Sequence, residues 1–139
     1  MSNILKAGKY FITDLCYVVP DNQWDEVCDA FDVAEDKNEV IINFKGVYIL
    51  KTAWGDGEYV ITRRGFSCGS FCVDSGTFAV IPEKFILDNQ YNANESLGTW
   101  VNVDVDCKLT VYVKGHVGFN EYDINTIGDS DYGYDGDDE

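Results

Sequence analysis

The sequence of 139 residues is poor in positive charge, with ten Lys and Arg residues against 25 Asp and Glu residues. It also has only two prolines, one methionine and one histidine. The resulting net charge of −15 excludes nucleic-acid binding through phosphate neutralisation, which needs clustered Lys and Arg. The natural complement of such a chain is a basic partner.

Other features that the sequence lacks narrow the possible class of protein further. No apolar run approaches the ~18 residues of a membrane span, and residues 1–6 lack the apolar region of a signal peptide, so we expect a cytoplasmic protein. The cysteines form no CxxC pair, which fits free thiols in a reducing compartment. They are Cys16, Cys28, Cys68, Cys72 and Cys107. A hydrophobic content of 45% is ample for a packed core.

The negative charge is concentrated in two segments. Residues 21–39 hold eight acids and one lysine, and residues 123–139 hold seven acids and no base. All other residues together contribute ten acids and nine bases. The sequence thus predicts a single domain over residues 1–127, in which a nearly neutral β-body carries an acidic helix, followed by a disordered acidic tail over residues 128–139.

The pattern of the domain is mainly β. Seven or eight short apolar runs at regular spacing predict an antiparallel β-sandwich or a small open barrel. Residues 40–44 and 47–52 flank Lys45-Gly46 as a hairpin, and residues 8–19 form one strand or two short ones. Residues 100–106 and 109–113 both alternate apolar and polar side chains, so we expect them to pair with each other.

One amphipathic helix is expected over residues 22–35, with Asn22 as its N-cap. Trp24, Val27, Cys28 and Phe31 form its apolar stripe. The opposite side carries four acids in steps of four, three and four residues: Asp25, Asp29, Asp32 and Asp36. Neighbours at this spacing repel one another, so folding gives no reason for the acidic row.

Three motifs resemble those of a loosely defined group of short, uncharacterised phage and bacterial proteins. They are an Asp-x-Cys-Tyr segment at 14–17, a Gly-Asp-Gly-x-Tyr turn at 55–59 and a Val-Asp-Ser-Gly entry to a strand at 73–76. Leucine precedes the cysteine here, where that group commonly has proline. The resemblance covers roughly the first 85 residues and implies a β-rich, phage-encoded protein, and it carries no catalytic residue across.

The sequence offers little for catalysis or for metal binding. Asp14, Cys16 and His116 could be imagined as a catalytic group, but a cysteine nucleophile needs an electropositive setting, and we predict no catalytic residue. The alternating acids from Asp129 lack the glycine and the final acid of an EF-hand loop, and no Cys and His spacing fits zinc. We therefore predict no metal and no cofactor.

The leading hypothesis is a non-enzymatic interaction protein that competes for the basic, nucleic-acid-binding surface of a host or defence protein. The acidic row and tail residues Tyr132, Tyr134 and Asp135 would make the contact. One alternative is a β-domain that sequesters a small ligand or nucleotide in a pocket lined by Trp54, Tyr59 and Trp100. Another is a virion or assembly component, which a symmetric oligomer would indicate.

Overall fold

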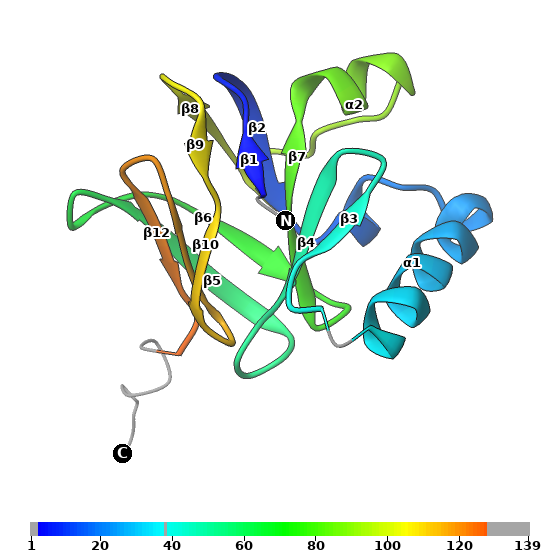
Figure 1. Cartoon of the computed structure of the whole chain (residues 1–139). Helices are drawn as coiled ribbons and strands as arrows, with labels where there is room; N and C mark the ends of the chain where they lie inside the picture. Colours follow the sequence, from blue (N-terminus) through cyan, green and yellow to red (C-terminus); the bar gives the residue numbers. More distant parts are fainter. Residues whose placement is uncertain (1–2, 38, 128–139) are drawn as a thin grey trace.

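The computed structural model describes residues 3–37 and 39–127. Two five-stranded antiparallel sheets lie face to face, and both helices lie on the outer side of one of them (Figure 1). The layers are therefore helix, sheet and sheet, and the predicted mainly β class with a sandwich architecture and an N-terminal helix is confirmed.

The first sheet has the strand order β3-β4-β7-β2-β8, and its strands in that order are Ile42–Phe44, Val47–Lys51, Thr77–Pro82, Gly8–Thr13 and Thr99–Val103. The second has the order β10-β11-β12-β5-β6, with strands Thr110–Val113, His116–Phe119, Tyr122–Asn125, Gly57–Arg63 and Phe66–Val73. A short antiparallel pair joins β1 (Ile4–Leu5) to β9 (Cys107–Lys108).

Two hydrophobic clusters hold these layers together. The larger cluster lies between the sheets, with Ile12 and Phe78 from the first sheet and Ile61, Phe71 and Ile124 from the second. The other fills the space between the first sheet and the helices. The first sheet is thus buried on both faces, which explains why β7 reads as a continuous apolar run.

The main helix, α1 (Trp24–Asp36), follows Pro20 and a 3-10 turn, η2 (Asp21–Gln23). Its extent agrees with the prediction, but Asn22 is not its N-cap: Asn22 lies inside the 3-10 turn, and Gln23 takes the cap position without a side-chain hydrogen bond. A second helix, α2 (Glu83–Asp88), and a 3-10 turn, η1 (Leu15–Tyr17), complete the helical elements of the described residues. Neither had been predicted, and η1 ends the strand expected over residues 8–19 after Thr13.

The predicted pairing of residues 100–106 with residues 109–113 is wrong. β8 pairs with β2 at the edge of the first sheet, whereas β10 pairs with β11 at the edge of the second. Residues 104–106 carry the chain from one sheet to the other, and Val105 is exposed rather than buried. Val113 of the other run is likewise exposed, at 55%. Val101, Val103, Leu109 and Val111 contribute to the same core, so the shared alternation does not make the two runs partners.

Candidate partner-binding surface

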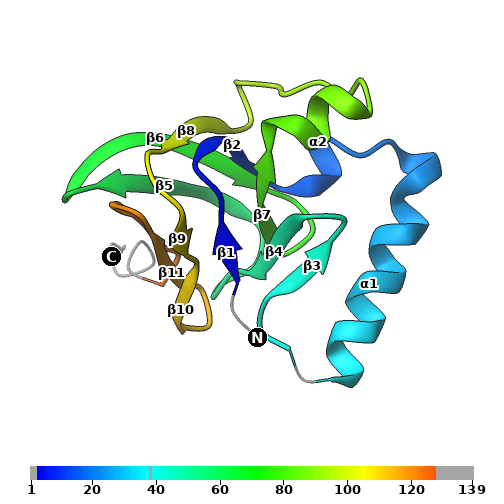
Figure 2. The same ribbon diagram turned by 45° about the horizontal axis from the view of Figure 1, so that its top comes forward.

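The four predicted carboxylates lie together on the outer side of α1. Successive helical residues are about 100° apart, so Asp25, Asp29, Asp32 and Asp36 fall within an arc of about 60° and span about 16 Å along the axis. All four are exposed, while Val27 and Ala34 are buried on the opposite side in the cluster that they share with the first sheet. Figure 2 shows α1 running alongside β3 of that sheet. We call these four side chains the acidic stripe.

The acidic stripe is not neutralised by the parts of the protein that the structure describes. Glu26, beside the stripe, forms an ion pair of 2.9 Å with Lys45, but none of the four stripe carboxylates has an ion-pair partner among residues 3–37 and 39–127. Val33 adjoins the stripe and is 53% exposed, so the face also offers apolar surface. Charge and apolar area are thus both free for a partner.

Three hollows of about 750, 380 and 320 Å³ adjoin the C-terminal half of α1. All three share Glu39 and Ile42, because residues 39–42 run from the end of the helix to β3 between them. The sequence analysis assigned no role to this segment, since hollows arise from how elements pack. The acidic stripe therefore lies beside a grooved surface rather than on an isolated helix.

The aromatic residues of the alternative ligand pocket lie in three different places. Trp54 is 62% exposed, and its indole Nε1 donates to the carbonyl of Ile127 at 3.3 Å. Tyr59 is buried between the sheets, whereas Trp100 packs against Phe11 in the other cluster with a ring distance of 4.9 Å. These three residues therefore do not line one common pocket.

Tyr132, Tyr134 and Asp135 lie outside the described residues. The last described segment is held at the end of the sandwich: the Thr126 amide donates to the Gly115 carbonyl at 2.8 Å, and the Thr126 hydroxyl accepts from the Ala53 amide at 3.0 Å. Thr126 and Ile127 therefore lie near the ends of β4 and β10.

Asp14, Cys16 and His116 do not form a catalytic group. His116 lies in β11, where it bonds Asp123 at 2.8 Å and packs against Tyr112 at a tilt of 48°. The Asp14 amide instead donates to the Cys72 carbonyl of β6, which lies three strands away from β11 in the second sheet. Burial, followed by the charge of Asp14 and a hydrogen bond to it, raises the pKa of the Cys16 thiol to about 12. A nucleophilic cysteine needs the opposite shift.

The fully buried Asp14 carboxylate instead joins two of the three motifs of the sequence resemblance, and Asp56 joins the third to them. It accepts from the Cys16 amide at 2.9 Å, the Asp74 amide at 2.8 Å, and the Ser75 amide and hydroxyl at 2.6 and 2.9 Å. Asp56 of the Gly-Asp-Gly turn accepts from the Gly76 amide at 3.0 Å. The three segments therefore meet where the chain crosses between the sheets, and their shared role is structural.

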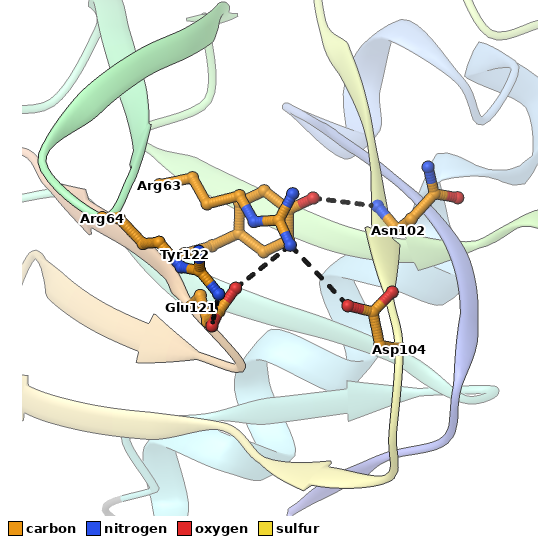
Figure 3. Close-up of polar contacts among 6 residues, drawn as sticks. All are labelled: Arg63, Arg64, Asn102, Asp104, Glu121 and Tyr122. Carbon is orange, nitrogen blue, oxygen red and sulfur yellow. Dashed lines mark hydrogen bonds and ion pairs between the residues drawn. The ribbon is translucent and has the colours of Figure 1, made fainter.

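A second charged cluster, which the sequence analysis missed, uses both arginines of the chain (Figure 3). Glu121 accepts from Arg63 at 3.0 Å and also pairs with Arg64, and these contacts lower the pKa of the Glu121 carboxyl. Arg63 lies over the ring of Tyr122, whose hydroxyl accepts from the Asn102 amide at 3.2 Å. Because both guanidinium groups are used here, neither offsets the acidic stripe.

Comparison of the chain with protein-family models, with curated proteins and with solved structures finds no match. The resemblance to short phage and bacterial proteins therefore stays a prediction. Within residues 3–37 and 39–127, no helix has the length and apolar character that crossing a membrane requires. The same residues hold no cluster of three or more His, Cys, Asp or Glu side chains suited to a metal ion.

Proposed function

We propose that the protein is a non-enzymatic interaction protein that binds a basic surface of another protein through the acidic stripe of α1. The observation that carries this proposal is the stripe itself: four exposed carboxylates in one narrow arc, without ion-pair partners in the described protein. Adjacent carboxylates at this spacing repel by a few tenths of a kcal/mol each, so the arrangement slightly destabilises the helix that bears it.

A row of carboxylates about 16 Å long presents a regular series of negative charges, as a phosphate backbone does. Its complement is therefore the kind of surface that binds nucleic acid, and the protein would act in the cytoplasm as a competitor for such a surface on a host or defence protein. Charge of this kind mainly accelerates association. The affinity of the complex would depend on apolar contact with the exposed Val33 and on a partner surface that fits the adjoining hollows.

The experiment is an affinity capture from bacterial lysate at about 50 mM and about 500 mM salt, between which exposed charges become strongly screened. The wild-type chain is compared with the variant Asp25→Asn, Asp29→Asn, Asp32→Asn and Asp36→Asn. We expect nucleic-acid-binding proteins to be retained by the wild type at low salt, released at high salt and absent from the variant. Addition of the wild type should also reduce DNA or RNA binding by the captured protein.

The control removes four negative charges elsewhere, with Asp74→Asn, Asp88→Asn, Glu95→Gln and Asp104→Asn. All four side chains are exposed and lie outside α1. This control should capture the same partners as the wild type, since it keeps the stripe. Equal capture by the stripe variant would sink the proposal.

A further inference from the structure

A groove next to the acidic stripe, with Asp32 of the stripe at its border, runs between the inner edge of α1 and the strand ends of both sheets. It consists of the adjoining hollows of about 380 and 320 Å³, which have Glu35, Glu39, Ile42 and Lys51 in common. Their combined volume falls in the range of ligand sites, about 300–1,000 Å³. The groove therefore has the size for a short segment of chain.

The floor of the groove belongs to the hydrophobic core. Leu50 of β4 and Val117 of β11, which are 2% and 1% exposed, line it together with Ile42. They come from different sheets, and the groove lies where the edge strands β3 and β10 of the two sheets are not joined to each other. An apolar side chain placed there would contact the core from outside.

The walls carry opposite charges. Glu35 and Glu39 lie on the side of α1, and Lys51 and Lys114 lie on the side of the strands. All four are exposed, and none forms an ion pair, with one another or with another side chain of residues 3–37 and 39–127. The groove thus has acids on one wall, lysines on the other and an apolar floor between them. A matching ligand has a positive end, an apolar middle and a negative end.

The edge of the second sheet adds a backbone component. β10 pairs with β11 on one side, and within the described residues no strand pairs with its other side. Val111 of this strand lines the groove, and Tyr112 and Val113 are exposed. An edge strand of this kind offers free N–H and C=O groups to an extended peptide.

We propose that this groove binds an extended peptide segment of a partner protein. An apolar side chain of the segment lies on the floor of Leu50 and Val117, a basic side chain faces Glu35 and Glu39, and an acidic side chain faces Lys51 and Lys114. The peptide backbone pairs with the free edge of β10. This site goes beyond the proposed function, because it depends on Glu35, Glu39, Lys51 and Lys114, which are not part of the acidic stripe; Asp32 of the stripe only borders the hollow of about 380 Å³.

The test is a selection of random heptapeptides displayed on phage against the immobilised full chain, followed by fluorescence polarisation with the selected peptides. The main variant, called the wall-exchange variant, reverses the charge of each wall residue by Glu35→Lys, Glu39→Lys, Lys51→Glu and Lys114→Glu. These four substitutions leave the net charge unchanged. The control exchanges charges outside the groove by Asp74→Lys, Glu95→Lys, Lys84→Glu and Lys108→Glu. Thermal unfolding establishes that each variant is folded.

We expect the wild type to select peptides in which an apolar residue lies between a basic and an acidic residue, in one common order because pairing with β10 gives the peptide one direction. The wall-exchange variant should bind them at least about fivefold more weakly, since four exposed attractions become repulsions, and should select the reverse order. The control should bind like the wild type.

Absence of a consensus, or equal affinity of the wild type and the wall-exchange variant, overturns the proposal. Tighter peptide binding by a chain ending at Ile127 also overturns it, because residues 128–139 would then compete for the groove themselves. The stripe variant keeps all four wall charges, so failure here and failure of the proposed function are separate results.

Discussion

At the scale of single residues, Asp14 was a candidate for a catalytic group in the sequence, but in the structure it holds segments of the chain together. Its carboxylate has no exposure and accepts four hydrogen bonds from two segments that are far apart in sequence. The oxygens of this carboxylate are thus occupied by donors of the protein itself. The Asp-x-Cys-Tyr pattern therefore marks the joint between β2 and the turn before β7.

Replacement of Asp14 by alanine should lower the free energy of unfolding by about 3–5 kcal/mol, because the amides of Cys16, Asp74 and Ser75 all lose the same fully buried acceptor. Urea denaturation monitored by circular dichroism measures this loss. Asp74→Asn is the matched control, since the Asp74 side chain is exposed and only its amide bonds Asp14. A loss below about 1 kcal/mol for Asp14→Ala would show that the joint can reorganise.

Cys16 allows a prediction about reactivity. With a pKa of about 12 against an ordinary 9.0, the thiol has about a thousandfold less thiolate at pH 8, and the greater nucleophilicity of that thiolate recovers only part of the difference. We expect iodoacetamide to modify Cys16 about thirtyfold more slowly in the folded chain than in urea. Peptide mass spectrometry measures both rates, with the exposed Cys68 as an internal comparison. Equal rates in both states would contradict the shift.

At the scale of elements, periodicity and turn residues predicted most of the local structure. The α1 helix and the hairpin around Lys45-Gly46 follow from side-chain spacing and from two residues with positive φ, 52° and 90°. The short helix α2 was missed because six residues show too little periodicity. The partners of β8 and β10 were wrong because alternation fixes which face is buried and not which strand lies alongside.

The turn between β10 and β11 provides a test at this scale. A Cβ at Gly115 would lie 2.6 Å from the Thr126 hydroxyl and 2.7 Å from the Ala53 amide nitrogen, and the residue has a φ of +91°. Gly65 has a similar φ of +86° with nothing within 4 Å. Gly115→Ala should therefore cost at least about 1 kcal/mol more than Gly65→Ala in thermal unfolding. Equal costs would mean that backbone strain alone matters at Gly115.

At the scale of the whole molecule, the two sheets differ in how they are covered. The first sheet is buried between the second sheet and the helices, whereas the second sheet carries exposed side chains such as Val60 and Tyr112 on its outer face. The sequence alone indicated the β class, but it could not show this layering, which depends on contacts between distant segments. The groove beside α1 is invisible in the sequence for the same reason.

Amide hydrogen exchange should reflect this layering. We expect the slowest exchange in β2 and β7, which are paired on both sides and covered on both faces, and the fastest at the tip of the β5–β6 hairpin near Phe66, which is 78% exposed. Exchange detected by NMR or mass spectrometry measures the order. Protection of the hairpin tip equal to that of β7 would contradict the layered arrangement.

The division of α1 into two sides has a consequence for how such a protein can change over generations. The side chains that pack against the first sheet and those of the acidic stripe do not overlap. Mutations can therefore alter the number and position of the carboxylates at almost no cost in folding. A chain built in this way can adapt to mutations in the surface of a partner by exchanging surface charges one at a time, while its hydrophobic core stays constant.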